Sequence, residues 1–144
     1  MTRTAKLLCV FYAAVALLAL YGTWSQNLDY FGPGAAGGAS FLPDLKVNPA
    51  SRSISIDIAF FFLAAAVLMV REARRIGIRF VWAYILMGFA VAISVSFQLF
   101  LLARELRMAS AAPAANPSQA IVALDLAGLV AMSALALYSL VWFH

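Results

Sequence analysis

Charged residues are scarce in this sequence of 144 residues. Lys and Arg number ten and Asp and Glu six, so that 11% of the chain is charged and 65% is hydrophobic. A soluble protein of this composition would expose large apolar patches on its surface. The composition therefore argues against a soluble enzyme or binding domain. It indicates an integral membrane protein with a single domain over residues 1–144.

Cysteine and histidine are almost absent as well. Cys9 is the only cysteine and His144 the only histidine. One cysteine cannot form an intramolecular disulfide, and one thiol with one imidazole cannot assemble a metal site. We therefore expect no metal and no bound cofactor.

Long apolar runs make up most of the sequence. Four stretches reach or approach the roughly 17 to 25 residues that cross a bilayer as a helix. The first could be a secretory signal, but Tyr21 and Trp24 at its exit are aromatic anchors, not a cleavage site. The sequence predicts an all-α, four-helix membrane bundle with an outer loop at 25–48. We expect its helices at about 7–24, 49–72, 80–104 and 117–143.

Basic residues sort by loop in this scheme. A basic loop on the cytoplasmic side joins the second and third helices and contains Arg71, Arg74, Arg75 and Arg79. Arg3 and Lys6 fall on the same side, whereas Lys46, Arg52, Arg104 and Arg107 fall on the other. The positive-inside rule then predicts a multi-pass protein of the inner (plasma) membrane with both termini cytoplasmic. The basic loop should contact anionic headgroups, and we expect no nucleic acid binding.

One sequence pattern occurs twice. Asn48-Pro49 precedes Asp57 by the same nine positions that separate Asn116-Pro117 from Asp125. Asn caps the free amides of a helix start and Pro fits the first helical position, so both pairs predict helix caps. In the four-helix scheme, the first and third helices run in the same direction. The repeat then predicts two tandem hairpins related by a pseudo-two-fold axis along the membrane normal.

Each repeated aspartate lies roughly 13 Å along its helix, inside the hydrocarbon region. A carboxylate facing lipid there costs about 2.5–3.5 kcal/mol, so both should face inward. We expect a polar, outward-opening pocket lined by Tyr21, Ser53, Asp57, Ser94, Gln98, Arg104 and Asp125. The same groups could instead satisfy one another, for example through an ion pair between an aspartate and Arg104.

Three stretches carry a resemblance to a known family. They are Asn48-Pro49 leading to Asp57, the segment 71–79 with Trp82, and Ser96-Phe97 through Arg104-Glu105. Over residues 48–107 the chain resembles the small bacterial membrane proteins grouped as domain of unknown function 2834. The resemblance implies a compact helical membrane protein and no assigned reaction.

The sequence favours a non-catalytic protein but does not exclude an enzyme. It would be an accessory subunit of a membrane complex, or a binder of a lipid or isoprenoid ligand, with a membrane protein or a second copy as partner. An isoprenoid cyclase or isomerase remains open, with Asp57 and Asp125 as paired acids. So does a proton-coupled carrier that acts as a dimer.

Overall fold

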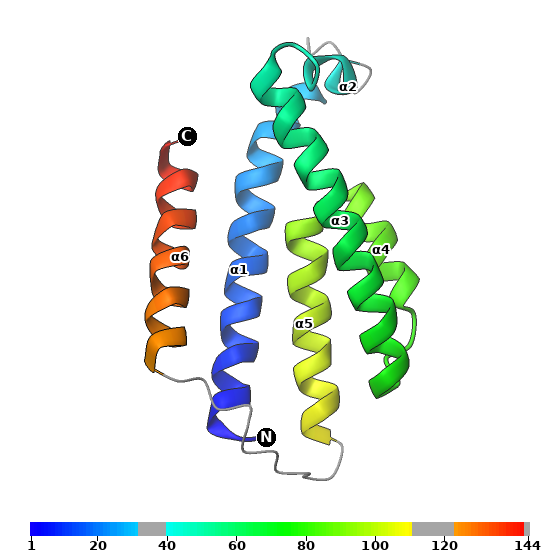
Figure 1. The fold of residues 1–144 in the computed structure, drawn as a ribbon, viewed down its shortest axis with the longest axis vertical. Helices are drawn as coiled ribbons and strands as arrows, with labels where there is room; N and C mark the ends of the chain where they lie inside the picture. The colour runs from blue at the N-terminus through cyan, green and yellow to red at the C-terminus, as the bar shows by residue number, and fades with distance from the viewer. Residues whose placement is uncertain (32–39, 111–122, 143–144) are drawn as a thin grey trace. The chain divides into compact units, whose positions relative to one another are not determined.

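The computed structural model describes residues 1–31, 40–110 and 123–142 (Figure 1). Every regular element in these residues is helical, which confirms the all-α class. The chain forms two compact units, Met1–Ala111 and Ala112–His144, and each is described by itself. The first contains α1 (Arg3–Asn27), η1 (Leu28–Tyr30), α2 (Phe41–Asp44), α3 (Pro49–Ile76), α4 (Val81–Ala90) and α5 (Ile93–Ser110); the second contains α6 (Ala123–Trp142). The four-helix bundle and the single domain stay predictions.

Local signals set the ends of the two longest helices. The side chain of Thr2 accepts a hydrogen bond from the amide of Ala5 at 3.2 Å and caps α1. Asn48 caps α3 in the same way through the amide of Ser51 at 2.9 Å, with Pro49 in the first helical position. Gly77 ends α3 in the left-handed conformation, at φ 73°, which glycine adopts without steric cost. The segments Arg3–Tyr30 and Pro49–Ile76 are long and apolar enough to cross a membrane.

The expectation of a single helix at 80–104 is wrong. The chain leaves the helical conformation at Val91 (φ −113°, ψ −73°) and forms two helices, α4 and α5. The two run antiparallel, because the rings of Tyr84 and Phe100 pack at 5.8 Å between centroids and a Cβ on Gly88 would lie 3.0 Å from Ser96 Oγ. This segment is therefore a helical hairpin with a very short turn.

A long-range hydrogen bond explains the break. The amide of Val95 bonds to the carbonyl of Ala92, which leaves the carbonyl of Val91 outside the helical ladder. Trp24, near the end of α1, donates to that carbonyl from Nε1 at 3.2 Å. A backbone carbonyl in apolar surroundings needs such a donor. The indole therefore stabilises the turn between α4 and α5.

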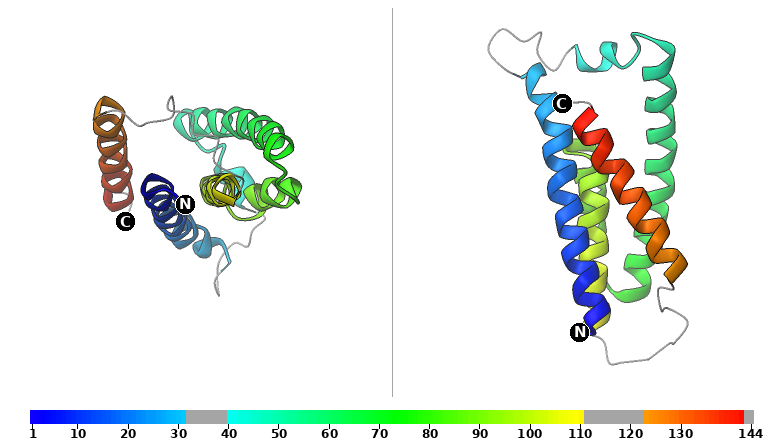
Figure 2. Two further views of the ribbon diagram at one scale, coloured as in Figure 1. Left: turned by 90° about the horizontal axis from the view of Figure 1, so that it is seen from below. Right: turned by 90° about the vertical axis from the view of Figure 1, so that its left-hand side faces the viewer.

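The hairpin sets the direction of α5. α1 packs along α5 and runs antiparallel to it, so that the N-terminus lies beside the last turns of α5 (Figures 1 and 2). The expectation that the first and third helices share one direction is therefore wrong. The reason is that α4 takes the chain up and α5 brings it back within the segment expected to cross once. The predicted pseudo-two-fold symmetry of two tandem hairpins relied on that shared direction and is no longer supported by it.

The core of the first unit lies between α3, α4 and α5. Its buried side chains are Phe62, Met69, Ala73, Val81, Ile85 and Phe100. Gly88 brings α4 close to both neighbours, because a Cβ there would approach the ring of Phe62 to 2.9 Å. That ring packs edge-on against Phe89 at 4.4 Å between centroids. The short α4 is thus held by tight packing along its length.

Replacing Trp24 with Phe removes the donor to Val91 and keeps most of the ring. A carbonyl left without a partner is costly, so we expect the free energy of unfolding to fall by about 1–3 kcal/mol. Denaturant unfolding in detergent micelles, followed by circular dichroism, measures the change. The matched control is Trp82→Phe, at an exposed indole on α4 that makes no hydrogen bond in the described part of the chain. Equal losses for both variants would contradict the role of Trp24.

Candidate functional site

The structure does not bring the residues of the expected polar pocket together. Ser94 lies in the first turn of α5 and Arg104 about 15 Å further along the same helix. The side chains of Tyr21, Ser53 and Asp57 are exposed. Asp57 makes no hydrogen bond or ion pair with any residue that the structure describes.

The other expected pocket residues give a mixed picture. Gln98 is half-buried, and its Oε1 atom is buried with no hydrogen-bond donor among the described residues. Asp125 lies in α6, where its side chain is outside what is described, and Asn116 and Pro117 lie outside the described residues altogether. Whether Asp57 and Asp125 form a pair therefore stays a prediction.

A cavity of about 500 Å³ lies at the end of the first unit where Trp24 meets the turn between α4 and α5. We call it the aromatic cavity. Only Ser94 of the expected pocket residues lines it. The rest of the lining is Thr23, Trp24, Asn27, Phe31, Phe41, Leu45, Ser55, Ile58, Phe62, Gly88, Phe89, Ala90, Val91, Ala92 and Ile93.

Aromatic contacts shape this cavity. The indole of Trp24 stacks on Phe31 at 6.5 Å between ring centroids, and Tyr30 meets Phe41 edge-on at 5.3 Å. Few polar groups reach the lining. The hydroxyl of Ser55 already donates to the carbonyl of Ser51 at 2.7 Å. The arrangement suits a hydrocarbon ligand with one or two hydrogen-bonding groups.

A charged cluster lies at the opposite end of the first unit and consists of Glu72, Arg75, Arg104 and Glu105. Arg104 donates from Nε to Glu72 at 2.7 Å and from Nη1 to Glu105 at 2.8 Å. Arg75 donates two hydrogen bonds to Glu72, at 2.9 and 2.6 Å. The side chains of Glu72 and Glu105 are only 14% and 10% exposed. The cluster therefore joins the end of α3 to the end of α5 by ion pairs whose carboxylates are nearly buried.

The charged cluster corrects the expected distribution of basic residues. Arg104 and Arg107 were expected on the side opposite the basic loop. Instead, Arg104 pairs with Glu72, and Arg107 donates from Nε to the carbonyl of Ile76 at 3.4 Å. Both contacts follow from the reversed direction of α5. In the basic loop, Arg71 and Arg74 are exposed, Arg75 belongs to the charged cluster, and Arg79 lines a second cavity.

Sequence reasoning missed the charged cluster for a physical reason. The pairs Arg71-Glu72 and Arg104-Glu105 both border apolar runs, which is a signal for buried charge at a helix end. That signal does not say which arginine meets which carboxylate. Within the described residues, no group of three or more His, Cys, Asp or Glu side chains lies close enough to hold a metal ion.

Residues 11–106 match the family model described as Protein of unknown function DUF2834. The chain belongs to this family. The match confirms the resemblance and extends it to most of α1. Neither a curated protein nor a solved structure shows significant similarity to the chain. The part matched to the DUF2834 family contains α4, α5 as far as Leu106, and the charged cluster.

Glu72→Gln tests the charged cluster. The substitution keeps the shape of the side chain but leaves the half-buried Arg104 with only Glu105 as its charged partner. We expect a loss of about 1–3 kcal/mol in the free energy of unfolding, since hydrogen bonds to charged groups are the strong ones. A double-mutant cycle with Arg104→Gln isolates the pair. Arg74→Gln, at an exposed arginine of the same end that forms no ion pair with a described residue, is the control and should change little. A coupling energy near zero would contradict the cluster's role.

Proposed function

We propose that this protein spans the inner (plasma) membrane several times and binds the hydrocarbon part of a lipid-like molecule in the aromatic cavity, without catalysing a reaction. The aromatic cavity carries the proposal. It is lined mainly by aromatic and aliphatic side chains, with a few residues that carry hydroxyl or amide groups. Cavities of this size and chemistry are typical ligand sites.

Exposed apolar side chains support the membrane location. On α3, the outward-facing residues include Ile54, Phe60, Phe61, Leu63 and Val67, each more than half exposed. Such a surface on a helix of 28 residues suits a lipid environment. The side chains that do not pack inside the first unit would thus contact acyl chains.

The distribution of basic residues supports an orientation. Eight of the ten Lys and Arg residues belong to the end where α1 begins and where α3 and α5 finish: Arg3, Lys6, Arg71, Arg74, Arg75, Arg79, Arg104 and Arg107. Only Lys46 and Arg52 lie toward the other end. The positive-inside rule then assigns the N-terminus to the cytoplasm and the aromatic cavity to the outer half of the bilayer. A cytoplasmic C-terminus stays a prediction.

No observation favours the catalytic alternatives over lipid binding. A cyclase or isomerase with paired acids needs two carboxyl groups at one reacting bond. Asp57 is exposed, and the carboxylates of Glu72 and Glu105 are held by arginines in the charged cluster. The carrier and accessory-subunit readings stay predictions.

Ile58→Trp tests the function by filling the cavity. Ile58 lines the aromatic cavity, and a larger side chain there would occupy the space that the ligand needs. We expect native mass spectrometry of protein purified from membranes to show less retained lipid on the variant than on the wild type. Ile56→Trp is the matched control, because Ile56 lies on the same helix, is 59% exposed and does not line the cavity.

Two outcomes would contradict lipid binding in the aromatic cavity. One is equal lipid retention by the Ile58 and Ile56 variants. The other is a wild-type protein that carries no lipid after purification in a mild detergent.

A further inference from the structure

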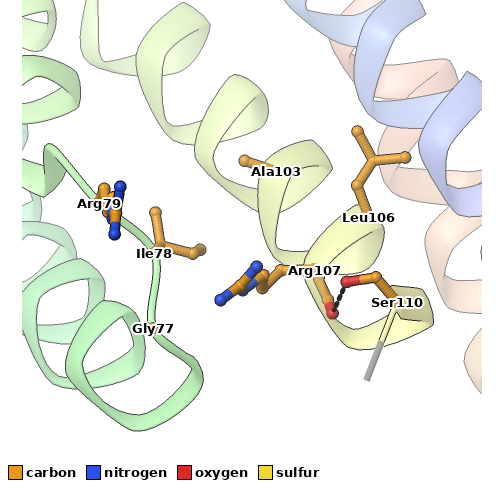
Figure 3. Close-up of a pocket in the computed structure, with 7 residues that line it drawn as sticks. All are labelled: Gly77, Ile78, Arg79, Ala103, Leu106, Arg107 and Ser110. Carbon is orange, nitrogen blue, oxygen red and sulfur yellow. Dashed lines mark hydrogen bonds between the residues drawn. The ribbon is translucent and has the colours of Figure 1, made fainter. Parts of the chain in front are cut away.

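A second cavity, of about 560 Å³, lies at the charged end of the first unit (Figure 3). We call it the basic cavity. The link between α3 and α4 forms one wall with Gly77, Ile78 and Arg79, and the last turns of α5 form the other with Ala103 and Arg107. Figure 3 shows the side chain of Arg107 reaching from α5 toward the link. The cavity thus lies where α3 gives way to α4, beside the end of α5.

Backbone geometry shapes this cavity. The left-handed turn at Gly77 carries the chain away from α3, and the amides of Gly77 and Ile78 both bond to the carbonyl of Ala73. Arg107 is held across the gap by its hydrogen bond to the carbonyl of Ile76 at 3.4 Å. The guanidinium group is therefore positioned by the fold and not only by solvent.

The positive charge of the basic cavity is not neutralised within the described part of the chain. Among the described residues, Glu72 and Glu105 are the carboxylates near this end, and both are bonded to Arg75 or Arg104. Arg79 and Arg107 form no ion pair with any described residue. Two arginines thus line one concave site without a counter-charge from any residue that the structure describes.

We propose that the basic cavity binds the phosphate group of an anionic phospholipid in the cytoplasmic leaflet. Arginine presents several N–H donors in a planar fork that matches phosphate oxygens. The apolar side chains of Ile78, Ala103 and Leu106 complete the lining and suit the start of the acyl chains, which favours a lipid phosphate over a free one. Basic pockets between membrane helices on the cytoplasmic side recognise anionic headgroups in this way. The proposal rests on the membrane location but not on the aromatic cavity.

The test measures binding of a short-chain phosphatidylglycerol to the purified full chain in neutral detergent, at one ionic strength. The variant Arg79→Gln/Arg107→Gln should bind about thirtyfold more weakly, since each basic residue near an anionic headgroup contributes about one kcal/mol. The matched control is Arg71→Gln/Arg74→Gln, which removes the same charge from exposed residues of the same end that do not line the cavity. The control should bind nearly as well as the wild type.

Two further arms identify the ligand. Phosphatidylcholine of the same chain length should bind far more weakly than phosphatidylglycerol, and inorganic phosphate should not displace the lipid. Ser110→Asp places a carboxylate at the exposed rim beside Arg107 and should also weaken binding without disturbing the core. If the double arginine variant fails to fold, Ser110→Asp alone tests whether the basic cavity binds phosphatidylglycerol.

Several results would overturn the proposal. Equal weakening in the two double arginine variants would mean general surface attraction, and no weakening in either would mean that no site exists. Displacement by inorganic phosphate at concentrations similar to that of the lipid would assign the cavity to the free anion. The Ile58→Trp experiment measures lipid retained after purification and not phosphatidylglycerol binding. A negative result for the basic cavity would therefore not contradict lipid binding in the aromatic cavity.

Discussion

The hydrogen bond from the indole of Trp24 to the carbonyl of Val91 is the contact on which the arrangement of the first unit depends. A turn with almost no loop inside an apolar segment leaves backbone groups that must find partners. The indole supplies a donor from a different helix. With that turn in place, α4 and α5 fold against each other, and α5 returns to the end where α1 begins.

The return of α5 separates the two ends of the first unit chemically. Arg104 comes within 2.7 Å of Glu72, and Arg107 reaches the last carbonyl of α3, so that cations gather where the helices finish. The opposite end holds the turn, the stacked rings of Trp24 and Phe31, and the aromatic cavity. A lipid anchored by its phosphate at one end and a hydrocarbon ligand at the other would use these two environments independently.

Local signals made part of this fold predictable. Asn48-Pro49 marks the start of α3, and the class of the fold follows from the apolar runs. The break at Val91 was not predictable, because the segment from Ala90 to Ser94 contains neither Gly nor Pro and its stabilising donor lies 67 residues away. The other differences follow from this break. A single helix at 80–104 would place Arg104 at the end opposite Glu72, and the expected polar pocket therefore combined residues from both ends of the first unit. Only Ser94 of that set lines the aromatic cavity.

The side of the membrane on which α5 ends tests the hairpin of α4 and α5 most directly. Single cysteines introduced by Thr4→Cys, Lys46→Cys and Ser110→Cys in a Cys9→Ser background can be labelled in intact cells and in opened cells with a membrane-impermeant thiol reagent. Position 46 should react from outside, whereas positions 4 and 110 should react only after the cells are opened. Labelling of position 110 from the same side as position 46 would contradict the hairpin, because α5 would then be the end of a single crossing helix.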